Sequence, residues 1–299
     1  MSAELKEKNT DVIENDGKKR YVIFNPHSGN SDGEAAVKYL SESFDNLSFL
    51  DITSIGDYSE FLSSLGSDDE IVLCGGDGTL NRFINETRGI PFSGRIAYLP
   101  KGNGNDFARD VKKETYTAPF YIDSYIDKLP TVTVKGKDYY FINGVGYGVD
   151  GYCCEVGDKL KAEGKKPNYT AIAIKGLLFH YTPTNATITV DGTPHSYKKV
   201  WIAPTMFGRY YGGGMMPTPD QRRDSEGGTV SAMSFHGCGK LRVLTIFPSI
   251  FKGEHVKHKK QIDVLRGKKI TVKFDSPRPL QIDGETILDV TEYTVKARN

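Results

Sequence analysis

Short glycine-rich segments that follow apolar runs are the residues best suited to chemistry. The clearest is GGDGT at residues 75–79, which follows the apolar residues 71–74 and opens a helix-like stretch. The first amides of a helix have no intrahelical acceptor, and glycine lets an anion approach them closely. An acid inside an anion site is unfavourable unless it holds a cation or takes a proton. Asp77 therefore predicts a Mg²⁺–phosphate arrangement or a base acting on a hydroxyl; the alternative is a tight strand–helix turn.

Three further segments strengthen the chemical interpretation. Residues 25–29 (NPHSG) end the first strand-like run, and residues 99–109 (LPKGNGNDFAR) end the fourth. In a parallel sheet, the loops at the carboxyl ends of the strands gather along one edge, where ligands bind. Residues 281–285 (QIDGE) form either a hairpin turn with two solvated acids or a pair of carboxylates delivered to the same site. Transfer to an alcohol needs such a base.

Up to about residue 125 the sequence alternates β-branched runs with helix-like stretches. Strands are expected at 21–24, 47–52, 70–74 and 95–99, and helices at 32–44, 58–65 and 79–87. This alternation predicts a parallel sheet covered on both faces.

Beyond about residue 125 most segments are strand-like and separated by turn residues, which predicts an antiparallel β-sandwich or barrel-like domain. Helices are expected at 169–180 and 240–251, and GVGYG at 144–148 is interpreted as a turn because no helix signal follows it. In chain order, the predicted organisation is a disordered tail at 1–18, an ATP-binding α/β domain at 19–125, and a β-rich lipid-substrate domain at 126–299. The last strand of the third part could return to the first domain.

The composition is that of an ordinary globular protein and excludes several function classes. The 299 residues carry a net charge of +1, so global charge does not favour nucleic-acid binding. The N-terminus is polar, and the chain lacks the run of about 20 apolar residues that spans a membrane. The four cysteines lack a zinc-site spacing, which predicts reduced thiols in a cytoplasmic protein. Walker and protein-kinase motifs do not occur.

Taken in order, these motifs resemble the diacylglycerol kinase catalytic family, which includes soluble bacterial diacylglycerol kinases and the sphingosine and ceramide kinases. GGDGTLN at 75–81 is the most specific match, and FIN at 141–143, GYG at 146–148, GGGM at 212–215 and FKGEH at 251–255 extend it. The resemblance implies an N-terminal Rossmann-like nucleotide lobe of the NAD-kinase and phosphofructokinase type, a C-terminal antiparallel β-sandwich lobe, and a cleft between them. It also implies ATP, Mg²⁺ and a lipid alcohol, above all diacylglycerol.

The resemblance assigns roles to individual positions. Asp77, Asp106 and Asp123 would form an acidic network around Mg²⁺, and Glu285, with Asp283, would serve as base and acceptor ligand. The nucleotide would contact residues at the strand ends: Asn25, Pro26, Ser28, Gly29, Thr53, Gly75, Gly76, Asp77, Gly78, Thr79, Asn81, Gly102, Asn103 and Asn105. Two positions depart from the family pattern. Asn103 replaces the usual threonine, and the stretch around Glu226, where a structural Mg²⁺ would bind, is one residue longer.

The expected partner is a lipid at a membrane surface, reached by peripheral contact; no nucleic acid is expected, and a homodimer is a further expectation. The basic segments 157–166 and 251–260 are either solvated surface or attracted to anionic head groups. The apolar residues between 172 and 179 either pack in the core or line an acyl-chain groove. Two other functions stay open: an NAD-kinase-like enzyme with a non-lipid acceptor, and a catalytically inactive homologue that binds lipid or nucleotide.

Overall fold

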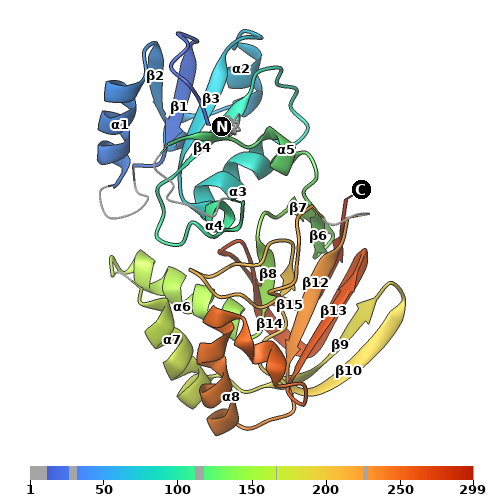
Figure 1. Ribbon diagram of the computed structural model, residues 1–299. Coiled ribbons are helices and arrows are strands. Elements are labelled where there is room, and N and C mark those ends of the chain that lie inside the picture. The colour runs from blue at the N-terminus through green and yellow to red at the C-terminus, as the bar shows by residue number, and fades with distance from the viewer. Residues whose placement is uncertain (1–11, 27–31, 112–117, 166, 225–227, 299) are drawn as a thin grey trace, which may run out of the picture. The chain divides into compact units, whose positions relative to one another are not determined.

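The computed structural model describes residues 12–26, 32–111, 118–165, 167–224 and 228–298 (Figure 1). Contacts among them divide the chain into two compact units. The first unit runs to Ala108 and includes the segment that ends at Asp127, and the second holds Arg109–Val111 and Lys128–Asn299. Within the described ranges, every helix is too short or too polar to cross a bilayer.

The first unit is built on a five-stranded sheet. Its strands are β1 (Arg20–Phe24), β2 (Leu47–Asp51), β3 (Glu70–Gly75), β4 (Ile96–Pro100) and β5 (Phe120–Tyr121). The spatial order is β2-β1-β3-β4-β5, in which the first four strands are parallel and β5 is antiparallel. Because β1 lies between β2 and β3, the winding of the chain reverses there. Doubly wound sheets bind their ligands at such a switch point.

Helices cover both faces of this sheet. Successive strand residues point to opposite faces, so strands that are apolar throughout must be covered on both sides. The helices are α1 (Asp32–Ser43), α2 (Tyr58–Ser63), α3 (Asp77–Glu86), α4 (Asp106–Val111), α5 (Asp123–Ile126) and the short η1 (Ile52–Ser54). Leu40 of α1 is buried in one cluster with Val72 and Leu99. From the other face, the ring of Tyr98 contacts that of Phe107 in α4, with centroids 6.0 Å apart.

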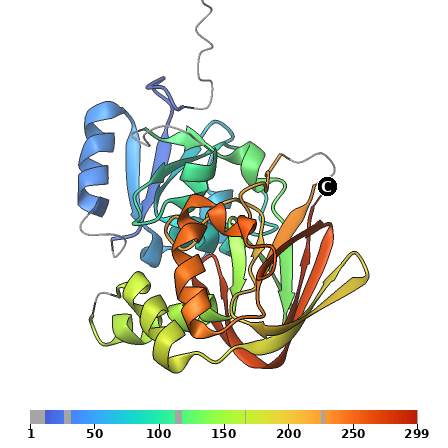
Figure 2. The ribbon, with the colours of Figure 1, turned by 60° about the horizontal axis from the view of Figure 1, so that its bottom comes forward.

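The second unit is built on a ten-stranded antiparallel sheet in which β14 pairs with β8, β9 and β15. The β9–β10 hairpin stands at one side of this unit in both Figure 1 and Figure 2. The strands are β6 (Thr131–Val134), β7 (Lys137–Tyr140), β8 (Gly144–Tyr147), β9 (Thr184–Val190), β10 (Thr193–Val200), β11 (Thr205–Met206), β12 (Val230–Phe235), β13 (Ile262–Gly267), β14 (Lys269–Ile282) and β15 (Glu285–Lys296).

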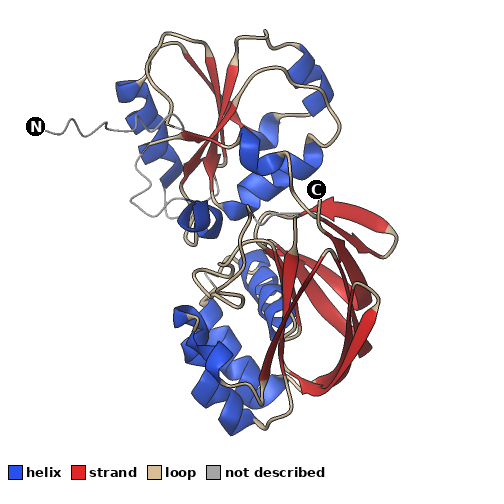
Figure 3. Cartoon of the chain, turned by 45° about the vertical axis from the view of Figure 1, so that its right-hand side comes forward, coloured by secondary structure: helices blue, strands red, loops and turns tan. Residues whose placement is uncertain are grey.

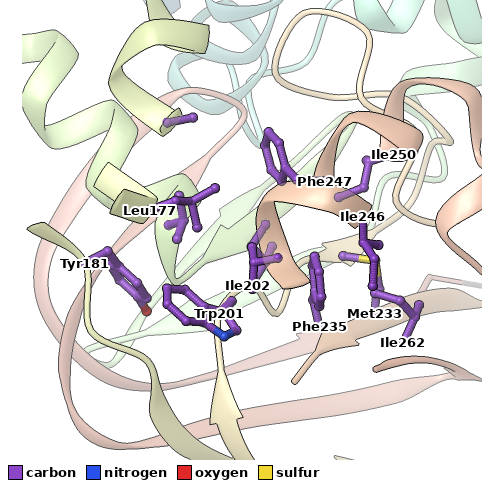
Figure 4. Close-up of a cluster of buried hydrophobic side chains, with 13 residues drawn as sticks. Leu177, Tyr181, Trp201, Ile202, Met233, Phe235, Ile246, Phe247, Ile250 and Ile262 are labelled. Carbon is purple, nitrogen blue, oxygen red and sulfur yellow. The ribbon is translucent and has the colours of Figure 1, made fainter. Parts of the chain in front are cut away.

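The helices of the second unit lie together on one side of its sheet (Figures 1 and 3). They are α6 (Val149–Ala162), α7 (Tyr169–Lys175), η2 (Gly176–His180), α8 (Lys240–Ile246), η3 (Phe247–Lys252) and η4 (Glu254–Lys257). We call α7, η2, α8 and η3 the helical layer. Leu177 and Phe247 of this layer point into one buried cluster with Ile202 and Phe235 of the sheet side (Figure 4). The inner face of the helical layer is therefore core.

The predicted fold class, a parallel-rich N-terminal sheet followed by an antiparallel C-terminal sheet, is confirmed. The interpretation of GVGYG as a turn is wrong, because residues 144–147 form β8 and lead into the 14-residue helix α6. Glycine inside α6 has a packing reason. A Cβ on Gly151 would lie 1.9 Å from the carbonyl oxygen of Pro279, so α6 contacts the backbone of β14 directly.

The predicted disordered tail is wrong for residues 12–18; residues 1–11 lie outside the described chain. Val12 forms a bridge with Phe120, and the amide of Ile13 donates to the carbonyl of Pro119 at 3.2 Å. Ile13 is 4% exposed. The segment therefore packs against β5.

A buried ion pair joins the amino ends of β1 and β3. Arg20 Nε lies 2.9 Å from Glu70 Oε2, and both side chains are almost fully buried. Arg20 also donates to Asp16, while Glu70 accepts from Lys18 and from the hydroxyl of Tyr121, each at 2.9 Å. Removing one partner of a buried pair strands the other charge, which costs about 3–5 kcal/mol.

We expect Arg20→Leu to lower the free energy of unfolding by about 3–5 kcal/mol in urea titrations, because Glu70 loses its buried counterion. Lys38→Gln is the control, since the Lys38–Glu42 pair is exposed and worth at most about 1 kcal/mol. Equal losses in the two variants would show that the Arg20–Glu70 pair is not a determinant of stability.

Candidate functional site

The register of the parallel strands brings the ends of several predicted loops to one edge of the first unit. Phe24 at the end of β1 pairs with Asp51 and with Cys74, and Gly75 pairs with Pro100. The segments that follow these strands therefore begin side by side. They carry Asn25, Thr53, Gly76 and Gly102, as the sequence predicts.

Asp77 binds the start of a neighbouring helix. Its Oδ2 accepts from the amide of Asp106 and its Oδ1 from the amide of Phe107, each at 2.9 Å. These are the first two residues of α4, whose amides have no acceptor inside the helix. Asp77 is also the first residue of α3. Its carboxylate thus fastens one strand–helix turn to the next.

The two glycine loops touch through their backbones. A Cβ on Gly102 would lie 2.5 Å from Cα of Gly76, and a Cβ on Gly75 would lie 2.6 Å from the hydroxyl of Thr79. The amide of Lys101 and the hydroxyl of Tyr98 both donate to the carbonyl of Gly75, at 2.8 and 2.9 Å. Burial raises the pKa of Tyr98 well above its ordinary value, so this hydroxyl stays a donor.

Gly78 differs from these glycines, because a Cβ there would meet nothing within 4 Å. It lies in the first turn of α3, a ten-residue helix whose N-terminal amides and dipole favour an anion. The surface beside Gly78 is therefore open to a ligand, whereas Gly75, Gly76 and Gly102 hold the loops together.

The remaining predicted nucleotide contacts have local partners. Thr53 is exposed, and both its amide and its hydroxyl donate to Asp51. Asn81 is 5% exposed and accepts from Asn85, so it supports α3 from within. Asn105 Oδ1 accepts from the amide of Gly102 at 2.9 Å, and Asn103 is exposed. Ser28, Gly29 and Glu226 lie outside the described residues.

The predicted three-carboxylate network is not assembled. Asp123 Oδ1 accepts from the amide of Ile96 at 2.9 Å, at the beginning of β4, and Arg95 lies 3.5 Å from its Oδ2. The Gly75 loop lies at the other end of β4, roughly 13 Å away along four residues of strand. The described residues contain no group of three His, Cys, Asp or Glu side chains placed to hold a metal. Asp77 and Asp106 do lie together.

In the second unit, Asp283 is an anchor for backbone amides. Its carboxylate accepts from the amides of Ile142, Asn143 and Gly144, which precede and begin β8. Asp283 itself has φ 47°, the left-handed conformation of a hairpin turn. Glu285 follows at the start of β15 and is exposed. The two predicted acids therefore differ: one is held by the fold and the other faces outward.

The same β8 turn is held from the other side by Arg223. Its guanidinium donates to the carbonyl of Ile142 at 2.5 Å and to Asn143 Oδ1 at 2.8 Å. Asp110 lies 2.5 Å from Arg223 and 2.7 Å from Arg209, and the carboxylate of Asp110 is only 4% exposed. Sequence reasoning missed this cluster, because its charged members, Asp110, Arg209 and Arg223, are distant in the chain and belong to none of the matched motifs.

Sequence reasoning also missed Asp150, in the first turn of α6. Its side chain is buried and accepts from the hydroxyl of Tyr211 at 2.6 Å. Burial raises the pKa of Asp150 to about 7, against the hydrogen bond from Tyr211, which lowers it. A Cβ on Gly146 would touch both Asp150 and Gln281, so Asp150 lies beside the strand that leads to Asp283. An acid two residues after GVGYG was the available signal.

Asp150 also lies on the side of α6 that faces the β14–β15 hairpin. Burial raises the pKa of Cys154 to about 12, and the carboxylates of Asp150, Asp158 and Glu285 contribute to this rise. The hydroxyl of Thr286 donates to Asp158 at 2.7 Å. Asp150 and Asp158 of α6 and Glu285 of the hairpin therefore lie near the same cysteine, with Lys161 acting in the opposite direction.

We expect Gly102→Ala to lower the free energy of unfolding by about 1–3 kcal/mol, because its new methyl group must displace the Gly76 backbone. Gly78→Ala is the matched control: it meets open space in a helix, where alanine is preferred to glycine by about 1 kcal/mol. Urea denaturation of both variants tests this prediction. A Gly102→Ala variant with the wild-type free energy of unfolding would contradict the close packing of the loops.

Asp150 predicts a pH dependence of stability. Between about pH 4 and pH 7 the folded protein keeps Asp150 protonated while the unfolded chain ionises it. The folded state then binds the extra proton, so stability falls with rising pH by up to about 1.4 kcal/mol per pH unit. Asp150→Asn should lack this fall in urea titrations across that range, whereas Asp224→Asn, at an exposed acid, should retain it. Parallel curves for Asp150→Asn and wild type would refute the assignment.

Comparison with known proteins agrees with this architecture. The family described as diacylglycerol kinase catalytic domain matches residues 19–132, and the family described as YegS C-terminal NAD kinase beta sandwich-like domain matches residues 143–296. A crystal structure of a diacylglycerol kinase from Bacillus anthracis superimposes with a TM-score of 0.61 at 20% identity, covering 94% of each chain. At that identity the likeness concerns the fold.

Two relatives with curated names differ in how much of their length this chain matches. A diacylglycerol kinase of Staphylococcus carnosus is 26% identical over 90% of this chain and 89% of its own. A diacylglycerol kinase of Mycobacterium tuberculosis is 24% identical over 63% of this chain, and the match spans 62% of that relative. With both family matches in chain order, this chain belongs to the diacylglycerol kinase catalytic-domain family, a family of lipid kinases.

Proposed function

We propose that this protein transfers the γ-phosphoryl group of ATP to the hydroxyl of a lipid alcohol, with diacylglycerol as acceptor and phosphatidic acid as product. The observation that carries the proposal is the pair of glycine loops packed backbone to backbone at the switch point of the first sheet. Family membership supports the reaction class. The relatives' names support the acceptor.

The nucleotide part of the proposal rests on α3 and its glycines. The phosphates would bind the N-terminal amides of α3 beside Gly78, where no side chain obstructs their approach. The main role of Asp77 would be to hold this turn against α4 through its two hydrogen bonds from the α4 amides. Mg²⁺ is commonly held by one or two carboxylates, waters and substrate phosphates, so Asp77 and Asp106 are the residues proposed to hold it. Its contribution when bound is to neutralise the triphosphate.

The acceptor part of the proposal rests on Glu285. A general base must reach the hydroxyl proton, and an exposed carboxylate at the start of β15 has that freedom. Asp283 would set the position of Glu285. Its carboxylate accepts hydrogen bonds from three backbone amides, and these bonds fix the turn that joins Asp283 to Glu285. Asp150 is a buried acid close to this hairpin, so it would influence the electrostatic environment in which Glu285 meets the acceptor.

The decisive experiment measures lipid phosphate formed from ATP and a panel of lipid alcohols in mixed micelles. We expect wild type to phosphorylate diacylglycerol, and Glu285→Gln to lose at least about 100-fold in kcat, since a general base contributes about that factor or more. Glu285→Gln should still bind ATP, as measured by calorimetry. Undiminished turnover by this variant would remove the base assignment.

Gly78→Ala tests the phosphate site with no structural ambiguity. Its methyl group meets no protein atom, so the free energy of unfolding should not fall, while ATP affinity should fall because the phosphates lose their approach. Asp77→Ala cannot separate the two effects, because it also removes the cap of α4. Wild-type ATP affinity in Gly78→Ala would place the nucleotide elsewhere.

A further inference from the structure

The helical layer carries most of the large hydrophobic side chains that are exposed among the described residues. Seven large hydrophobic side chains are exposed there and elsewhere, and five of them belong to the helical layer: Tyr169, Ile174, Phe179, Leu241 and Phe251. Phe179 is 72% exposed and Leu241 is 80% exposed. Side chains of this size are normally covered, and clusters of them mark interaction surfaces.

The two elements that carry Phe179 and Leu241 are neighbours. Leu177 of η2 and Val243, Ile246 and Phe247 from α8 and η3 enter the same buried cluster. Each element therefore buries part of its surface in this cluster (Figure 4), while Phe179 and Leu241 on the same elements are exposed. The two most exposed apolar side chains of the layer therefore lie on two neighbouring helical elements rather than on loops.

The charge of the helical layer is one-sided. The chain as a whole has 39 basic and 38 acidic residues. Yet residues 165–190 and 227–253, which contain the whole layer, have six basic residues and no acid. Four of them, Lys175, Lys240, Arg242 and Lys252, lie in the layer itself, and Lys165 and Lys166 precede it.

Neighbouring α6 does not cancel this charge. Its acids Glu155 and Asp158 are each paired with a lysine of the same helix, and Glu163 is paired with Lys165. Lys175, Arg242 and Lys252 of the layer are exposed beside the apolar residues. The layer therefore combines exposed phenylalanine and leucine with basic side chains, the composition of helices that lie in the membrane interface.

We propose that the outer face of the helical layer docks on an anionic lipid bilayer, with Phe179 and Leu241 inserted at the head-group boundary and Lys175, Arg242 and Lys252 on the lipid head groups. The proposal deepens the proposed function and rests on it for its purpose, since an enzyme whose acceptor stays in a bilayer must reach the interface. A second copy of the chain fits less well, because a two-fold contact sets this acid-free face against itself.

Co-sedimentation with lipid vesicles tests the proposal without ATP and without diacylglycerol. Wild type should bind vesicles of phosphatidylcholine mixed with phosphatidylglycerol, bind pure phosphatidylcholine more weakly, and lose binding as salt rises. Phe179→Ser with Leu241→Ser should lower the partition coefficient at least about tenfold. Lys175→Gln with Arg242→Gln and Lys252→Gln should lower it about fivefold per charge on anionic vesicles only.

Leu288→Ser is the matched control, because Leu288 is 50% exposed on β15 and outside the helical layer. It should bind vesicles as wild type does, and thermal melting should show all variants folded. Wild-type binding by the two layer variants would overturn the proposal. So would a dimer that requires Phe179 and Leu241 in a protein that does not bind vesicles, because a second copy then covers this face.

The outcome is independent of the kinase proposal. If the protein phosphorylates no lipid but still binds vesicles through these residues, the docking surface stands and the proposed acceptor is wrong. If it phosphorylates a short-chain soluble acceptor but the layer variants bind vesicles normally, the reaction stands and the docking surface is wrong.

Discussion

The carboxylate of Asp77 is the contact on which the first unit's loop edge depends. It reaches from the start of α3 to the two leading amides of α4, and in doing so it holds the Gly102 loop against Gly76. Two backbones at this distance leave no room for side chains between them. The start of α3 is therefore held in place by close glycine contacts and by one acid.

The second unit uses the same device. Asp283 accepts from three successive amides ahead of β8, and Arg223 takes the carbonyl and side-chain oxygens of the same turn. In both units the aspartate of a DG pair accepts hydrogen bonds from backbone amides and so fixes a turn. A carboxylate bound by several amides is a rigid reference point, so the residue next to it gains a defined position. Gly78 directly follows Asp77, and Glu285 lies two residues after Asp283.

The sequence was enough to predict the sheets, but not to predict helix α6 or the positions of individual acidic side chains. Apolar runs such as residues 71–74 predicted the central strands correctly, and strand order placed the glycine loops at one edge. Helix α6 was missed because Gly151 and Gly157 weaken its helical pattern, although they serve contacts with Pro279 and Tyr169. Asp123 was misplaced because nothing in the sequence shows that α5 returns to the beginning of β4. Burial of Asp150 likewise depends on a tertiary contact with Tyr211.

These placements give the three carboxyl groups near the β14–β15 hairpin different environments. Asp283 is committed to amides, whereas Asp150 is enclosed by protein and Glu285 is exposed. Burial raises the pKa of Asp150 toward neutrality, so this carboxyl changes its charge in the range where a cell operates. Enzymes that separate acid and base roles do so by giving two carboxyls contrasting environments. The chain meets that condition around α6 and the β14–β15 hairpin, which is why the acceptor chemistry is assigned there.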